Sequence, residues 1–127
     1  MCLRYKIREK YYNLKYRCQR FIRGYADEDI WNIDCWFIEN MKKIFPEFIK
    51  RTNSHPSELT WEEWKELLNT MNDLLHKMDI DDVAAVVFKK ESYELSETDA
   101  RIAKEMVNRN RKLFFYAFNQ YFDHLWY

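Results

Sequence analysis

Tight turns are difficult to build into this sequence, because its 127 residues include only one glycine and two prolines. A β-sandwich or β-barrel needs a turn roughly every ten residues, and glycine and proline supply many of the required conformations. The composition therefore argues against an all-β fold and favours long helices joined by a few loops. The length suits one domain with one hydrophobic core.

The first half of the chain contains two stretches whose apolar residues recur every three or four positions, as in amphipathic helices. The first covers residues 3–23 and stops before Gly24, a residue suited to a helix C-terminus. The second begins at Asp27, the expected N-cap, and continues to about residue 51. Its apolar surface is so wide that we expect burial on much of its circumference. Residues 52–59 read as a loop.

Two more helices are predicted in the second half. Thr60 and Glu63 have capping-box spacing at the start of the third helix. The acidic stretch 79–82 either ends this helix or caps a short apolar piece, 83–88. Ser96, with Asp99, can cap a last helix that reaches the C-terminus. The seam expected on the third helix consists of Trp61, Trp64, Leu68, Met71, Leu75 and Met78. We therefore predict an all-α, single-domain bundle of four to five helices over residues 1–127.

The sequence contains no motif that predicts an active site. It lacks a Gly-rich phosphate loop, a G-x-S-x-G elbow and an H-E-x-x-H pair. Asp73 and His76 have the spacing of di-iron ligands, but the second such pair is missing. The three cysteines lack metal or redox spacing, so we expect reduced thiols buried in the core. We expect no enzymatic activity, no metal and no cofactor.

Residues 1–10 do not resemble a secretory signal, and no apolar run approaches the roughly 20 residues that span a membrane. We therefore expect a cytoplasmic protein without a membrane partner.

Charge is strongly segregated along the chain. Residues 1–23 carry eight basic residues and one acidic residue, a net of +7, whereas residues 24–95 carry eight basic and sixteen acidic residues, a net of −8; the whole chain is neutral. Tyrosines stand among the N-terminal cations, and exposed aromatic rings beside arginine can stack on single-stranded bases. The candidate residues for polyanion binding are Arg4, Tyr5, Lys6, Arg8, Tyr12, Lys15, Tyr16, Arg17 and Arg20.

The same basic helix has a structural interpretation, which we favour. It would pack its apolar face on the bundle and meet acidic helices at its edge, and this needs no ligand because the chain supplies its own acidic counterpart. Binding to an anionic membrane is a third use. It is the least favoured, because it would withdraw the apolar face from the core.

A family resemblance rests on two segments. Residues 23–34 read R-G-Y-A-D-E-D-I-W-N-I-D and resemble the R-G-Y-S-D-x-D-x-W-N-x-D signature of small uncharacterised proteins of phages and prophages of gut bacteria. Residues 56–64 resemble that family's P-x-x-L-T-x-E-E-W segment. The resemblance covers residues 3 to about 78, and departs from the pattern at Ala26, where Ser is usual, and at residues 53–55. It implies a phage origin and no particular chemistry.

The signature residues read as fold-defining. They supply a glycine C-cap, an aspartate N-cap and a tryptophan that joins two helices; Asp29 and Asp34 are candidates to hold Arg20 or Arg23 in a partly buried ion pair. The residues assigned a structural role are Arg23, Gly24, Asp27, Asp29, Trp31, Asp34 and, on the third helix, Trp64.

The resemblance and the lack of catalytic motifs suggest a binding protein that modulates or inhibits a host or defence protein, for example as an anti-CRISPR-type inhibitor. The high aromatic content, 18% of residues, agrees with this, because aromatic residues anchor protein interfaces. The alternatives are nucleic-acid binding through the basic first helix, and a structural role as a homo-oligomer or virion-associated protein.

Overall fold

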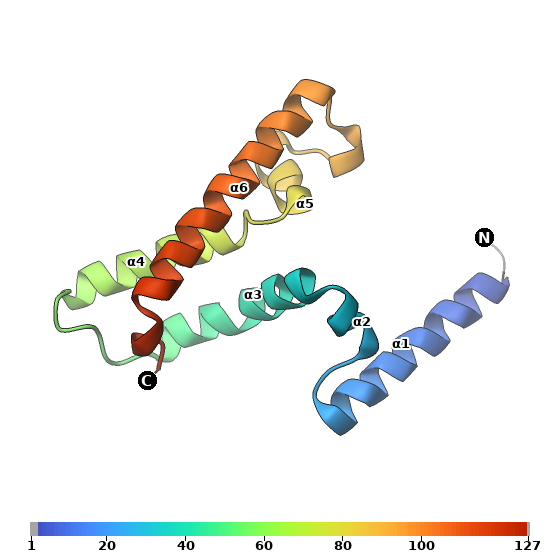
Figure 1. The fold of residues 1–127 in the computed structure, drawn as a ribbon, viewed down its shortest axis with the longest axis horizontal. Helices are drawn as coiled ribbons and strands as arrows, with labels where there is room; N and C mark the ends of the chain where they lie inside the picture. Colours follow the sequence, from blue (N-terminus) through green and yellow to red (C-terminus); the bar gives the residue numbers. More distant parts are fainter. Residues whose placement is uncertain (1–2, 127) are drawn as a thin grey trace. The chain divides into compact units, whose positions relative to one another are not determined.

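The computed structural model describes the backbone of residues 3–126 and the side chains of residues 8–126. The fold is all-α, as predicted (Figure 1). The chain divides into two compact units, residues 1–39 and residues 40–127. The elements are α1 (Leu3–Arg23), α2 (Asp27–Trp31), α3 (Ile33–Arg51), α4 (Trp61–Leu75), α5 (Ile80–Val83), the π-helix η1 (Ala84–Phe88), the 3-10 turn η2 (Ser92–Glu94), α6 (Glu97–Gln120) and the 3-10 turn η3 (Phe122–His124).

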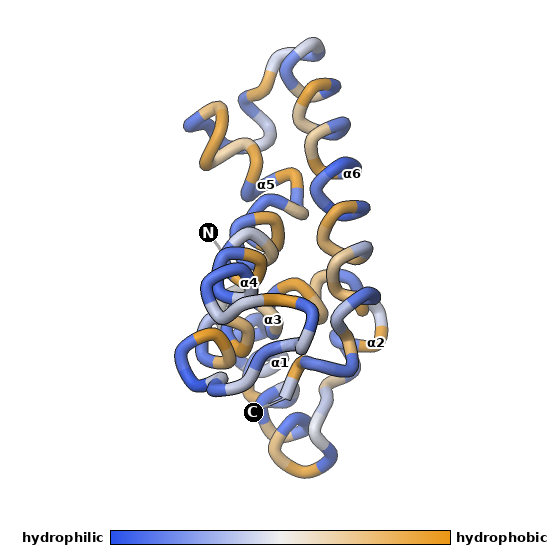
Figure 2. The backbone as a smooth tube through the Cα atoms, turned by 90° about the vertical axis from the view of Figure 1, so that its left-hand side faces the viewer, coloured by the Kyte–Doolittle hydropathy of each residue, from blue (hydrophilic) through white to orange (hydrophobic). Residues whose placement is uncertain are grey.

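The second unit is built around α4 and α6, which lie side by side and run antiparallel (Figure 1). The predicted α4 seam is confirmed, since all of its members from Trp64 to Met78 are buried and Trp61 is half-buried. On α6 the facing stripe includes Ala103, Val107 and Phe114, all buried. Along both helices apolar and polar stretches follow one another with the period of an amphipathic helix (Figure 2).

Local hydrogen bonds begin α4 and α6 where the sequence predicts. The Glu63 N–H donates to the Thr60 hydroxyl at 3.2 Å, and the Thr60 N–H donates to the Glu63 carboxylate at 2.9 Å. The Asp99 N–H donates to the Ser96 hydroxyl at 3.1 Å. These bonds satisfy N–H groups that a first helical turn leaves unpaired. α6 ends at Gln120, so the last helix stops short of the C-terminus.

The segment after α4 forms the short apolar piece that the sequence predicts, as α5 followed by η1. Val83 packs with Ala103 and Val107 of α6 in a small core, with Phe88 and Leu95 at its edge. Lys89 ends η1 in the left-handed region, at φ 54°. The C-terminal half of α3 joins this unit through Phe45, which is buried and packs edge-on against Phe114.

The first unit differs from prediction at the start of its second helix. Gly24 adopts φ +86°, and the chain reverses there as expected. A Cβ added at this position would meet no other atom within 4 Å, so the requirement for glycine comes from the backbone angle and not from crowding. The N-cap of α2, however, is Ala26 and not Asp27. Ala26 has no acceptor side chain for the N–H groups of the first turn, but its own N–H donates to the Asp29 carboxylate at 2.7 Å.

The predicted second helix is also interrupted. Asn32, at φ −133° and ψ 61°, separates α2 from α3, whereas α3 continues through Pro46. The expected burial around this helix is found only in part: Phe45 is the only residue of α3 that is buried, and Trp31, Ile33, Trp36 and Ile44 are exposed. The half-buried apolar residues are Phe37, Ile38, Met41, Phe48 and Ile49. The periodicity shows which positions on this helix are apolar. It does not show which of them other parts of the chain bury.

Candidate functional site

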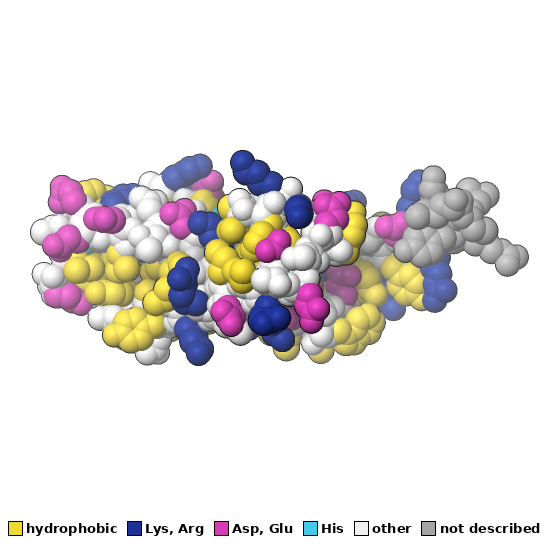
Figure 3. All heavy atoms as spheres, turned by 90° about the horizontal axis from the view of Figure 1, so that it is seen from above, with side chains coloured by type: hydrophobic (Ala, Val, Ile, Leu, Met, Phe, Trp, Pro, Cys, Tyr) yellow, Lys and Arg dark blue, Asp and Glu magenta, His cyan; other side chains and the backbone are white. Residues whose placement is uncertain are grey.

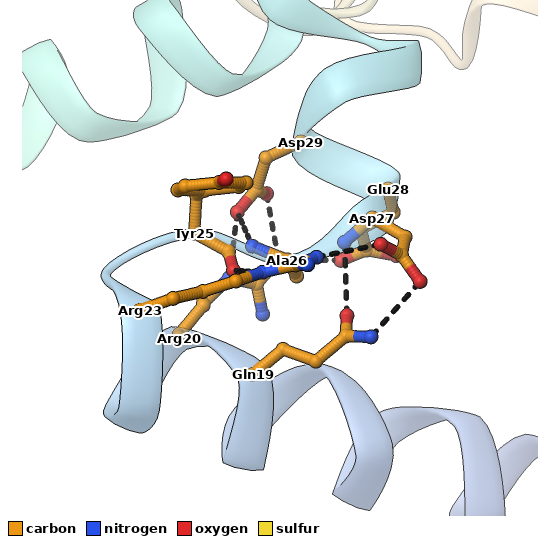
Figure 4. Close-up of polar contacts among 8 residues, drawn as sticks. All are labelled: Gln19, Arg20, Arg23, Tyr25, Ala26, Asp27, Glu28 and Asp29. Atoms are coloured by element: carbon orange, nitrogen blue, oxygen red, sulfur yellow. Dashed lines mark hydrogen bonds and ion pairs between the residues drawn. The ribbon is translucent and has the colours of Figure 1, made fainter.

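The end of α1 is tied to the start of α2 by an ion-pair cluster (Figure 4). Arg20 donates from Nε and Nη2 to the two oxygens of Asp29, at 3.1 and 2.8 Å, and from Nη2 to Glu28 at 2.6 Å. A two-point guanidinium–carboxylate bond fixes both distance and orientation. Arg20 thus sets the angle at which α2 leaves the Gly24 turn.

Asp27 is the second anchor of this corner. It accepts hydrogen bonds from Arg23 at 2.5 Å and from Gln19 at 2.9 Å, and the Lys15 ammonium lies 3.8 Å away. The Asp27 N–H donates back to the Gln19 amide oxygen at 2.9 Å. The Arg23 guanidinium also lies over the Tyr25 ring, 4.5 Å from its centroid. Gln19 and Arg23 of α1 therefore bind Asp27 across the Gly24 turn.

The cluster shifts the titration of its members. Arg20 lowers the pKa of the Asp29 carboxyl below its ordinary value, and hydrogen bonds from Gln19 and Arg23 lower the pKa of Asp27. The pKa of Arg20 is raised by the hydrogen bonds to Asp29 and Glu28. All of these groups are therefore charged at neutral pH, and folding favours their charged forms.

This corner decides which face of α1 is covered. Tyr12, Tyr16 and Gln19 share a helix face and are half-buried. The predicted core stripe lies on another face and is exposed: Tyr11 is 63%, Leu14 62% and Phe21 92% exposed. The expectation that α1 packs this stripe on the bundle stays a prediction, and Leu3 and Ile7 lie outside the described side chains. The expected burial of the thiols is wrong for Cys18 and Cys35, which are exposed, and Cys2 lies outside the described residues.

The exposed stripe has cations on both sides. Arg8 lies along one side, and Lys10 and Arg17, seven residues apart, along the other. Within residues 8–126, these three side chains form no ion pair. Figure 3 shows hydrophobic side chains reaching the molecular surface among charged ones. We call Arg8, Lys10, Tyr11, Leu14 and Arg17 the docking face.

The candidate polyanion residues differ in whether a carboxylate already pairs with them. Arg4, Tyr5 and Lys6 lie outside the described side chains. Arg20 is bound to Asp29 and Glu28, and Lys15 lies beside Asp27. Arg8 lies over the Tyr12 ring at 5.7 Å, and Tyr12 and Tyr16 have their ring centroids 6.1 Å apart. Polyanion binding by these residues stays a prediction, with Arg8 and Arg17 as its unpaired described cations.

The signature residues differ in burial and in ion pairing. Arg20 forms an ion pair with Asp29, which is one of the predicted pairs. Arg23 forms its ion pair with Asp27, which was not predicted as its partner. Trp31 is 69% exposed and so does not join two helices as expected. Asp34 is exposed and forms no ion pair in the described part of the chain. Trp64 is fully buried in the second unit, with its ring 5.6 Å from Tyr121.

The next feature to consider is whether metal-binding side chains gather near this corner. Among the described residues, no three His, Cys, Asp or Glu side chains come together as a metal site would require. A shallow apolar hollow of about 420 Å³ is lined by Tyr25, Ile30, Ile33 and Trp36 beside the ion-pair cluster. No described helix is long and apolar enough to cross a membrane. The arrangement offers apolar contact and charge, which are the means of binding.

Comparisons of the chain with protein-family models, curated proteins and solved structures found no match. The site must therefore be interpreted from its own geometry.

Sequence reasoning missed the ion-pair cluster as the determinant of the covered face. A signal was present, because three consecutive acids, residues 27–29, follow the Gly24 reversal and need partners. Gln19, Arg20 and Arg23 lie on the part of α1 that such a reversal brings back toward them. The apolar stripe instead predicted burial of another face of α1, since apolar periodicity usually marks the buried face.

Proposed function

We propose that this chain is a non-enzymatic binding protein that docks α1 on another protein. The apolar stripe would enter a groove on the partner, and the flanking cations would meet acidic residues at its rim. An amphipathic helix in an apolar groove is a recurrent recognition mode. The observation that carries the proposal is the exposure of Tyr11 and Leu14 between cations that no described carboxylate neutralises.

Charge favours a protein partner over a nucleic acid or an anionic membrane. The chain has no net charge, and its residues 24–95 carry a net of −8, which an extended polyanionic surface repels. A groove on a protein contacts α1 alone, and screening at physiological salt limits interactions of exposed charges to about 8 Å. The half-burial of Tyr12 and Tyr16 also leaves less of each ring for stacking on bases.

The resemblance to phage proteins supports a partner among host or defence proteins in the bacterial cytoplasm. Inhibition by occupying a surface, as an anti-CRISPR-type inhibitor does, is one form of this function. It requires no catalytic residue in the chain.

The test is affinity capture from a nuclease-treated bacterial lysate, followed by reconstitution with each purified candidate. Leu14→Asp and Lys10→Gln/Arg17→Gln are expected to weaken binding at least about tenfold, because each removes one element of an amphipathic docking surface. Ile102→Asp, on the exposed side of α6, and Asp34→Asn are the matched controls and should retain binding.

Three outcomes contradict the proposal. One is that no captured protein binds after purification. Another is that the docking-face variants bind as tightly as the controls. The third is that a protein is captured from an untreated lysate but not from the nuclease-treated one, or that vesicles with anionic lipids compete for the interaction; either result assigns α1 to a polyanion or a membrane.

A further inference from the structure

The chain contains a surface that complements its own docking face. Residues 79–99, which we call the acidic segment, comprise α5, η1, η2 and the start of α6 and carry seven acidic and two basic residues, a net of −5. Asp82 is bound by Lys42, whereas Asp81, Glu91, Glu94 and Glu97 form no ion pair within the described residues. The segment therefore presents unneutralised carboxylates.

Exposed apolar side chains lie among these carboxylates. Val86 and Val87 of η1 are 54% and 43% exposed, and Tyr93 of η2 is 83% exposed. Both valines lie on a π-helix, and π-helical turns often occur at functional sites. The acidic segment thus has the two properties that the docking face requires of a partner, apolar contact area and negative charge.

We infer that a second copy of this chain is a partner of the docking face, which binds the acidic segment of that copy. The inference rests on the proposed function, because it uses the same face of α1. Pairing of α1 with α1 is disfavoured, since residues 1–23 of each copy carry a net of +7. Opposite charges attract when the docking face of one copy meets the acidic segment of the other.

Each surface is small, so the association is of the transient type, whose interfaces lie below about 1,200 Å². It weakens as salt is added, because exposed charges on both surfaces are screened. Self-association and binding of a foreign protein compete for α1. A foreign partner with higher affinity therefore converts the self-associated protein into complexes.

The experiment is a charge exchange followed by sedimentation equilibrium of the purified protein at low salt. The first variant is Lys10→Glu/Arg17→Glu, and the second is Glu91→Lys/Glu94→Lys. Each variant alone should self-associate at least about tenfold more weakly than the wild type, because like charges now meet. An equimolar mixture of the two should recover the wild-type mass, since each reversed surface finds its opposite on the other variant.

Glu62→Lys/Glu66→Lys, on the exposed start of α4, is the matched control and should associate like the wild type. Circular dichroism melting checks that each variant is folded. A wild type with the mass of one chain up to its solubility limit would overturn the inference, as would a mixture that stays as weak as its components. Because no host protein is present, either result leaves the proposed function to be decided by reconstitution with a foreign partner.

Discussion

Arg20 of α1 and Asp29 of α2 form a two-point ion pair, with donor–acceptor distances of 3.1 and 2.8 Å. The same carboxylate accepts the Ala26 N–H at 2.7 Å and so also completes the start of α2. One aspartate therefore anchors α1 and begins the next helix. The pair holds the side of α1 that carries Arg20 toward α2, and the docking face lies on another side of the same helix.

Removal of Asp29 should loosen the corner. We expect Asp29→Ala to speed hydrogen exchange of the Ala26 amide and to cost about 1 kcal/mol, the usual size of a cap or an exposed ion pair. Native-state hydrogen exchange measured by NMR checks both effects. Asp34→Ala, which removes an exposed carboxylate without an ion pair in the described chain, should leave the Ala26 amide unchanged. Equal exchange rates in the two variants would rule out the anchoring role.

The corner should also loosen in acid. Because the folded pKa values of Asp27 and Asp29 are lowered, their contribution to stability is complete above the unfolded value of about 3.9 and is lost as pH falls through the folded values. Hydrogen exchange at the Ala26 and Asp27 amides, corrected for its intrinsic pH dependence, should show protection that is constant from neutral pH to about pH 5 and declines below pH 4. Protection that declines between pH 7 and 5 would assign the transition to other groups.

The core of the second unit depends on Trp64. Its side chain is fully buried on the α4 seam, so Trp64→Ala should destabilise the protein by about 3 to 5 kcal/mol. Trp31→Ala removes an equally large side chain from an exposed position and should change stability by less than about 0.5 kcal/mol. Urea unfolding followed by far-ultraviolet circular dichroism measures both. Similar losses in the two variants would contradict the assigned burial.

Polyanion binding should be weak, because the α1 cations nearest the turn are already bound to carboxylates. Any binding of duplex DNA should lose up to about 2.7 units of its slope of log affinity against log salt in Arg8→Gln/Lys10→Gln/Arg17→Gln, since three phosphate contacts disappear. Titrations at several salt concentrations check this. Tight wild-type binding that this variant abolishes without a change in melting temperature would favour nucleic acid over protein as the partner.

Local sequence was sufficient at the starts of α4 and α6 and at the Gly24 turn, but not at the start of α2, whose N-cap is Ala26 and not Asp27. The starts of α4 and α6 were predictable because Thr60 and Ser96 bind N–H groups three residues further along the same chain. The α4 seam was predictable because its period matches a helix with one buried face. The turn at Gly24 followed from the only residue in the chain without a Cβ.

Tertiary structure decided which apolar faces are covered. Periodicity assigns residues to a face of α1 or α3, but burial depends on side chains from other elements that approach it. On α1 the choice was made by Gln19, Arg20 and Arg23, whose partners at residues 27–29 lie across the reversal at Gly24. Those three residues lie on the same side of α1 as the half-buried Tyr12 and Tyr16, whereas Tyr11 and Leu14 lie on the opposite side and are exposed.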